Sequence, residues 1–157
     1  MARVTAHNPP MPRPARVDEM ELVRTLFREY QAHLGIDLCF QGFEAELAGL
    51  PGKYKAIWFA EVEGKVAGVV ALRPLEEGVG EMKRLFVRPE FQGRGLGKAL
   101  AEKVVEGARH EGYRALRLDT LSTMETAVAL YRKMGFVDIA PYTVNPVDGA
   151  MFLELTL

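Results

Sequence analysis

The sequence predicts a mixed α/β fold, in which a sheet of parallel and antiparallel strands is covered by helices on its faces. Two strand patterns joined by a tight turn in the middle of the chain indicate an antiparallel hairpin. Helix and strand patterns then alternate toward the C-terminus, which is typical of βα units. A chain of 157 residues corresponds to one domain, so we expect a single domain over residues 1–157.

The composition is that of a soluble globular protein, with 48% hydrophobic and 26% charged residues. A formal net charge of −1 disfavours a nucleic-acid partner and binding to an anionic membrane. The single cysteine, Cys39, excludes an intrachain disulfide and a thiolate zinc cluster, and we expect no metal. Because we find neither a membrane-spanning apolar run nor the apolar segment of a signal peptide, we expect a cytoplasmic protein.

The N-terminal segment differs from the rest, because residues 1–16 hold four of the nine prolines. Proline lacks a backbone donor, so this segment is either an extended arm or a broken edge strand. We assign residues 1–12 to a proline-rich arm. A first helix is expected next, because Asp18 and Glu21 have capping-box spacing and Gly35 provides a stop. Apolar residues recur at helical spacing between them: Val23, Leu26, Phe27, Tyr30 and Leu34.

A short helix over residues 42–49 and three strands are expected next. Residues 54–62 and 65–73 are rich in β-forming residues and flank the turn Glu63-Gly64, as in a hairpin. A third strand over residues 81–88 shows regular alternation. One face would carry Met82, Arg84 and Phe86, and the other Lys83, Leu85 and Val87.

The second half of the chain alternates helix and strand. Residues 95–110 form a helical pattern whose buried stripe is Leu96, Leu100 and Val104. The pattern continues with a strand, a helix and a strand, over residues 113–120, 124–134 and 136–140. Turn residues at 145–149 precede a final strand over residues 150–157.

A glycine-rich turn joins the third strand to the helix that begins at Gly95. Glycines at such a position let an anion approach the backbone N–H groups and the positive end of the helix dipole. The dinucleotide fingerprint fails because Lys98 stands where a glycine is needed, and the P-loop pattern fails at Gln92 and Ala99. The turn is therefore a cradle for a diphosphate, or its glycines serve only the close packing of strand and helix.

The segment Gln92-x-x-Gly95-x-Gly97 after a strand resembles the Q/R-x-x-G-x-G/A signature of the GNAT superfamily of acyl-CoA-dependent N-acetyltransferases. A second segment, Ala127-x-x-Leu130-Tyr131-x-x-x-Gly135-Phe136, resembles the second signature of that superfamily. Arg13-Pro14-Ala15-Arg16 is similar to the opening of many members, so the resemblance covers residues 11–157.

This resemblance implies a mostly antiparallel sheet that splays between residues 81–88 and 113–120, with acetyl-CoA as cosubstrate. The backbone of Leu85, Phe86 and Val87 would pair with pantetheine. The pyrophosphate would be held by Gln92, Gly93, Arg94, Gly95, Leu96, Gly97 and Lys98.

Tyr131 matches the residue that hydrogen-bonds or protonates the departing thiolate in many members, the alternative being a core aromatic. This chain departs from the family at Met124, where many members carry an asparagine that bonds pantetheine. The replacement is left open among Thr120, Ser122 and Thr123.

Four other side chains have two interpretations each. Glu81 is interpreted either as a catalytic base that acts through water or as a solvated charge at a strand end. Arg84 binds an anionic acceptor or pairs with an acid. His33 contributes to the acceptor site or interacts with the helix dipole. Cys39 is an apolar filler rather than a nucleophile.

The function expected is N-acetylation of a small-molecule or amino-acid-like amine by direct attack in a ternary complex. Residues 35–54 and 142–149 would line the acceptor cleft. The alternatives are a protein or peptide N-acetyltransferase and a non-catalytic acyl-CoA-binding regulatory module. A homodimer is left open as the oligomeric state.

Overall fold

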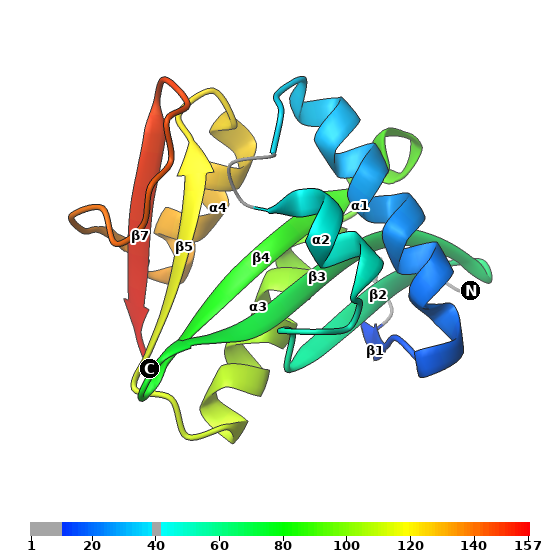
Figure 1. Cartoon of the computed structure of the whole chain (residues 1–157), viewed down its shortest axis with the longest axis horizontal. Helices are drawn as coiled ribbons and strands as arrows, with labels where there is room; N and C mark the ends of the chain where they lie inside the picture. The colour runs from blue at the N-terminus through cyan, green and yellow to red at the C-terminus, as the bar shows by residue number, and fades with distance from the viewer. Residues whose placement is uncertain (1–10, 39–41) are drawn as a thin grey trace, which may run out of the picture.

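The computed structural model describes residues 11–38 and 42–157, and its centre is a seven-stranded sheet of order β1-β2-β3-β4-β5-β7-β6 (Figure 1). Neighbouring strands are antiparallel except β4 and β5, which are parallel, so the mixed, mostly antiparallel sheet is confirmed. The strands are β1 (Arg13–Pro14), β2 (Ala56–Val62), β3 (Lys65–Glu76), β4 (Val79–Val87), β5 (Ala115–Leu121), β6 (Val137–Asp138) and β7 (Ala150–Thr156).

The helices of the described residues cover both faces of the sheet, as expected (Figure 1). They are α1 (Met20–Leu34), α2 (Phe43–Ala48), α3 (Leu96–His110) and α4 (Glu125–Met134). Helices α1 and α2 bury Phe27 and Phe43 against Phe59 of β2. Helices α3 and α4 form a second core on the opposite face, with Leu100 against Trp58 and with Tyr131. The sheet thus separates two apolar cores.

The two central strands separate along their length. Parallel pairing of β4 with β5 covers Val79–Ala115, Gly80–Leu116 and Glu81–Arg117, and no further pair exists between them among the described residues. Beyond this point β5 pairs along its whole length with β7, while β4 stays with β3. Figure 1 shows the two strands diverging toward their carboxyl ends. The expected splay is therefore present.

A β-bulge in β4 changes the side-chain alternation that the sequence predicts. The register with β3 shifts between Val69–Phe86 and Ala71–Lys83, so β4 holds one extra residue there. Arg84 in this segment has a φ of 61°, a left-handed conformation that is rare for a non-glycine residue. Met82 therefore packs in the α3 core and Phe86 in the α1 core, and the expectation that they share a face is wrong.

The N-terminal elements also differ in detail from expectation. Residues 1–10 of the proline-rich arm lie outside the described residues, whereas Arg13 and Pro14 form an edge strand beside Phe59 and Trp58. The helix start expected at Asp18 is wrong. Glu19 makes the capping contact instead, accepting the backbone N–H of Arg16 at 2.8 Å, and α1 begins at Met20 after a short 3-10 helix.

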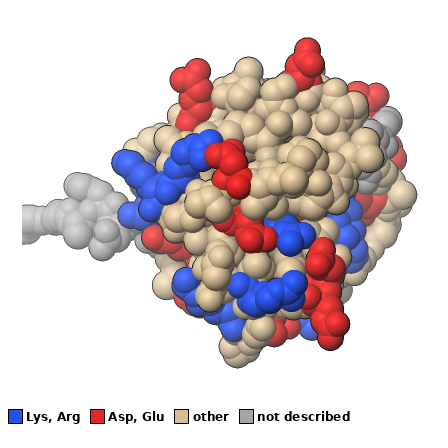
Figure 2. All heavy atoms as spheres, turned by 90° about the vertical axis from the view of Figure 1, so that its left-hand side faces the viewer, with Lys and Arg blue, Asp and Glu red and all other residues tan. Residues whose placement is uncertain are grey.

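Acidic and basic side chains are interspersed on the side of the molecule where β7 lies (Figure 2). Arg132 of α4 pairs with Asp138 of β6 at 2.9 Å, and Arg117 of β5 pairs with Glu154 of β7 at 2.8 Å. Within residues 11–38 and 42–157, no helix has the length and apolar character needed to cross a bilayer.

Candidate functional site

A groove of about 810 Å³ lies where β4 and β5 diverge. Its walls come from the carboxyl end of β4, the glycine turn, the start of α3 and the start of α4. Of the expected cofactor-binding residues, it is lined by Leu85, Val87, Gln92, Gly93, Gly95, Leu96, Gly97 and Lys98. The split of the sheet thus brings the strand end and the glycine turn together.

The glycine turn presents bare backbone to this groove. Gly93 and Gly95 have φ values of 83° and 80°, which L side chains rarely adopt, so the turn requires glycine at both. Gly97 is helical, and a Cβ at this position would meet nothing within 4 Å. Close packing therefore does not explain the absence of a side chain at Gly97, and the open space lies on the groove side.

The first turn of α3 is suited to binding an anion. Its N-cap, Gly95, makes no side-chain capping hydrogen bond, and the first turn has no acidic residue. The backbone N–H groups there carry the positive end of the helix dipole and have no intrahelical acceptor. Lys98 adds a positive charge to the groove wall. These residues fit the diphosphate of the acetyl-CoA that the resemblance implies.

Two expected cofactor residues do not line the groove. The guanidinium of Arg94 lies 5.7 Å from the centre of the Phe91 ring. The side chain of Phe86 is buried against α1, with its ring 6.1 Å from that of Tyr30 and 5.8 Å from His33. The role proposed for Phe86 concerns its backbone, which the direction of its side chain leaves unaffected.

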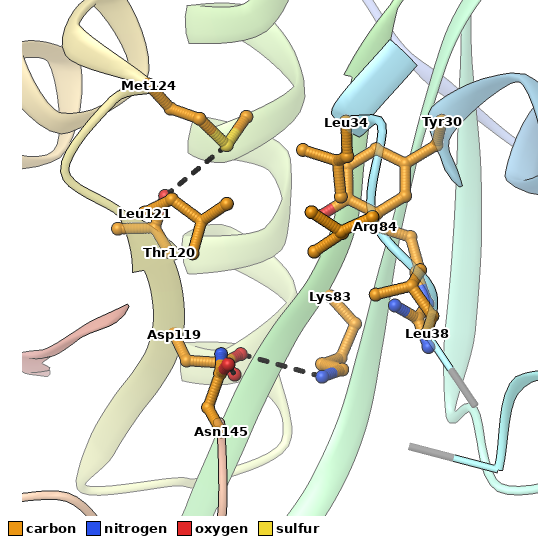
Figure 3. Close-up of a pocket in the computed structure, with 11 residues that line it drawn as sticks. Tyr30, Leu34, Leu38, Lys83, Arg84, Asp119, Thr120, Leu121, Met124 and Asn145 are labelled. Carbon is orange, nitrogen blue, oxygen red and sulfur yellow. Dashed lines mark hydrogen bonds and ion pairs between the residues drawn. The ribbon is translucent and has the colours of Figure 1, made fainter. Parts of the chain in front are cut away.

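A second compartment lies on the α1 side of the sheet, a cavity of about 40 Å³ (Figure 3). Leu34, Leu121 and Met124 line both this cavity and the groove, so the two compartments adjoin. The segments expected to line the acceptor cleft contribute Ile36, Leu38 and Asn145. Polar groups from the two separating strands also reach it: Lys83, Arg84, Asp119 and Thr120.

Arg84 at the bulge is held by a buried carboxylate on α2. Its guanidinium donates two hydrogen bonds to Glu46, at 2.8 and 3.1 Å, and both side chains are nearly inaccessible. Burial raises the pKa of Glu46, but hydrogen bonds from Arg84 and the charge of Arg84 outweigh it, so the pKa lies below the ordinary 4.5. Of the two roles given for Arg84, the structure shows the ion pair.

Glu81 is buried at the point where β4 and β5 separate. Its side chain is 2% exposed and accepts hydrogen bonds from Arg73 at 3.1 Å and from the hydroxyl of Tyr142 at 2.5 Å. The solvated strand-end interpretation is therefore wrong. Burial and the charge of Glu81 raise the pKa of Tyr142, so this hydroxyl stays protonated and donates.

Tyr131 is 6% exposed, and its ring lies 5.6 Å from that of Phe136 in the α3 core. Ala127 and Leu130 of the same helix line the groove, whereas Tyr131 itself is not among the lining residues. Burial raises the pKa of Tyr131, so its hydroxyl is a hydrogen-bond donor at neutral pH.

The remaining sequence candidates are placed differently. His33 lines the groove, and Cys39 lies outside the described residues. The hydroxyl of Thr120 approaches the sulfur of Met124 at 3.8 Å. Of the residues named as replacements for the missing asparagine, Thr123 lines the groove and Thr120 lines the cavity.

Sequence reasoning identified Arg84 and Thr120 but missed three other polar residues of the cavity wall, Lys83, Asp119 and Asn145. Lys83 lies 3.6 Å from Asp119, which also accepts a hydrogen bond from Asn145 at 3.0 Å. These contacts join β4, β5 and the β6–β7 loop. No short sequence motif indicates that these residues lie close together. The alternation of β4 and β5 places each charge on a face, but the pairing of the strands is needed to bring them together.

Comparison with known proteins gives one consistent family. Residues 20–136 match the Acetyltransferase (GNAT) family. An uncharacterized N-acetyltransferase of Schizosaccharomyces pombe is 35% identical, over 88% of this chain and 89% of its own length. An IAA acetyltransferase of Azospirillum brasilense is 39% identical, over 62% of this chain and 65% of its own length.

A solved structure has the same fold. It is yncA, a putative acetyltransferase of Salmonella typhimurium, determined with its cofactor acetyl-CoA. It superposes with a TM-score of 0.72 at 19% identity, over 93% of this chain and 92% of that chain.

Gly97→Val should weaken acetyl-CoA binding by at least about 10-fold without unfolding the chain, because the new side chain would fill the open space at the start of α3. The unfolding free energy should change by less than about 1 kcal/mol, since valine and glycine are both poor helix formers. Calorimetry measures the affinity, and Ala129→Val, exposed on α4, is the control. Unchanged acetyl-CoA affinity in folded Gly97→Val would contradict the assignment of the glycine turn as the diphosphate-binding site.

Glu46→Gln should lower the unfolding free energy by about 3 kcal/mol at pH 7, because a buried arginine loses its ionised partner. The control Glu44→Gln, on the same helix, breaks an exposed pair with Arg28 and should cost less than about 1 kcal/mol. Because the folded pKa of Glu46 is lowered, its contribution is present above pH 4.5 and is lost as the pH falls through the folded pKa.

The difference between wild type and Glu46→Gln in urea unfolding should therefore shrink in acid. Equal losses of unfolding free energy in Glu46→Gln and Glu44→Gln at pH 7 would show that the buried pair contributes no more to stability than the exposed pair.

Proposed function

This chain belongs to the acetyltransferase (GNAT) family, and we propose that it transfers an acetyl group from acetyl-CoA to the amine of a small-molecule or amino-acid-like acceptor, by direct attack in a ternary complex. One observation carries the proposal. The groove with the glycine cradle and the cavity on the α1 side of the sheet adjoin at Leu34, Leu121 and Met124. A cofactor in the first and an acceptor in the second would meet at the split between β4 and β5.

The residues of the groove have distinct proposed roles toward acetyl-CoA, which supplies the thioester when bound. Backbone N–H groups from Gln92 to Lys98 hold the pyrophosphate, with Arg94 and Lys98 as nearby positive charges. The backbone of Leu85, Phe86 and Val87 pairs with pantetheine. The support is that β4 has no pairing partner on the β5 side beyond Glu81 in the described chain. A backbone N–H of Phe86 or Val87 donates to the carbonyl oxygen as negative charge develops there.

Placement of the two reactants is the main catalytic effect in this proposal. Holding an amine against a thioester in the reactive geometry supplies about 7–11 kcal/mol. The two compartments adjoin at the split of the sheet, and the buried Glu46–Arg84 pair lies at the bulge of β4 beside them.

Glu81 is the proposed base, acting through water. An amine with the pKa of a lysine, about 10.4, costs about 4.6 kcal/mol to deprotonate at pH 7, whereas an α-amine at about 7.7 costs about 1 kcal/mol. Burial of Glu81 on β4, two residues before Lys83 of the cavity wall, supports a role on the acceptor side. Its bonds from Arg73 and Tyr142 hold the carboxylate in one orientation.

The size of the cavity supports a small acceptor. A volume of about 40 Å³ accommodates on the order of three water-sized groups, which is the reacting end of a small molecule. The name of the Azospirillum brasilense relative gives IAA as its acceptor, which supports a small acceptor here as well.

The decisive experiment measures thiol release from acetyl-CoA across a panel of small amines, amino acids and peptides. Turnover with small amines or amino acids is expected, with peptides at least about 10-fold poorer in kcat/KM. A preference for peptides would show that the acceptor is a peptide or protein amine and not a small molecule. Binding of acetyl-CoA with no transfer to any amine would favour a regulatory module.

Tyr131→Phe should lower kcat by roughly 100-fold, because its hydroxyl is proposed to donate to the departing thiolate. The raised pKa of Tyr131 makes complete proton transfer to a thiolate unfavourable, so stabilisation by donation is the expected effect. Acetyl-CoA affinity should change little, since a thioester sulfur is a poor acceptor.

The matched control is Tyr113→Phe, outside the groove and the cavity. An unchanged kcat in Tyr131→Phe would leave Tyr131 as a core aromatic. A parallel loss of affinity and kcat would make it a wall of the cofactor site.

A further inference from the structure

We infer that Met124 limits the length of the acyl group that this protein accepts and restricts it to the two carbons of acetyl. This inference rests on the proposed acetyl transfer and adds a residue that determines its specificity. It depends on the junction of the groove and the cavity, where Leu34, Leu121 and Met124 line both compartments. Under the proposed function the transferred acyl group lies at this junction, because cofactor and acceptor meet there.

The junction is formed by apolar side chains. Helix α1 contributes Leu34 on one side, and the segment from the end of β5 to the start of α4 contributes Leu121 and Met124 on the other (Figure 3). Within the described part of the chain, no polar side chain lines both compartments. An acyl group at the junction therefore meets hydrocarbon and sulfur, which suits an unsubstituted alkyl chain.

Met124 is a large apolar side chain that the packing of the fold does not explain. It is half-buried, and among the described residues both Met124 and Leu121 lie outside the two apolar cores. Leu34 differs, because it packs against the α1 core. The surroundings that Met124 shapes are those of the groove and the cavity.

The position of Met124 is fixed by contacts on both its backbone and its side chain. Its N–H donates to the carbonyl of Leu121 at 2.9 Å, and as the N-cap of α4 its carbonyl accepts the N–H of Val128 at 2.9 Å. The hydroxyl of Thr120 donates to the sulfur at 3.8 Å, the contact dashed in Figure 3. Since the backbone bonds do not involve the side chain, truncation should open the junction and leave the start of α4 in place.

An acyl chain longer than acetyl would have to pass Met124 and enter the cavity. The volume of about 40 Å³ holds only on the order of three water-sized groups, and the acceptor needs this space. The cavity wall also contains Arg84 and Asp119, and an alkyl tail beside these charges offers them no hydrogen bond. Alanine in place of Met124 removes three heavy atoms, which leaves room for the two additional methylenes of butyryl.

The test measures the affinities of the full chain for acetyl-CoA and butyryl-CoA by calorimetry, without an acceptor. The wild type should bind butyryl-CoA at least about 10-fold more weakly than acetyl-CoA, because discrimination by an apolar pocket reaches this size for a single methylene. Met124→Ala should raise the ratio of butyryl-CoA affinity to acetyl-CoA affinity by at least about 10-fold. Met124→Leu, which keeps a large apolar side chain, should retain the wild-type ratio.

The matched control is Met134→Ala, on the same helix and outside both compartments, which should leave the ratio unchanged. The circular dichroism spectrum checks the folding of each variant. If Met124→Ala does not fold, Met124→Ser takes its place, because serine is a preferred N-cap residue and is as short as the test requires. An unchanged ratio in the folded short variant, or an equal rise in Met134→Ala, would overturn the inference.

The wild-type comparison also decides by itself. Equal affinities for acetyl-CoA and butyryl-CoA overturn the limit on acyl length and leave acetyl transfer standing. Failure of the proposed function has a different signature, which is the absence of binding of either acyl-CoA or the absence of acetyl transfer to every amine in the panel.

Discussion

The parallel pairing of β4 with β5 ends after three residue pairs, and the rest of the site depends on this interruption. A continuous sheet would separate the α1 side of the molecule from the α3 side with a closed layer of backbone. Where the strands diverge, the groove reaches α3 and α4 as well as the end of α1, and it adjoins the cavity at Leu34, Leu121 and Met124. A ligand in each compartment can then approach the other through the plane of the sheet.

Opening a sheet at its centre places polar groups in a buried region, and the chain satisfies them in pairs. Arg84 at the bulge is bonded to Glu46, Lys83 faces Asp119 across the split, and Glu81 accepts from Arg73 and Tyr142. Buried ion pairs contribute little net stability compared with apolar packing, but losing one member is costly. Of these contacts, the one between Lys83 and Asp119 joins β4 to β5 directly, and it favours one arrangement of the two strands.

The β6–β7 loop is held against the two central strands by the same means. Tyr142 bonds Glu81 of β4, and Asn145 bonds Asp119 of β5. The loop thus contacts both strands on the two sides of the split. Because each contact is made to a buried carboxylate, the position of the loop is coupled to the buried charges of β4 and β5.

The sequence alone determined the elements whose signals are local. Hydrophobic periodicity predicted α1, α3 and α4, and turn chemistry predicted the β2–β3 hairpin. The glycines predicted the tight turn before α3. Neighbours in sequence decide each of these features. Only the tertiary structure decided the bulge at Arg84, the burial of Glu81 and the facing of Lys83 and Asp119. These depend on register and on contacts between strands far apart in the chain, since a shift of one residue in pairing moves every side chain to the other face.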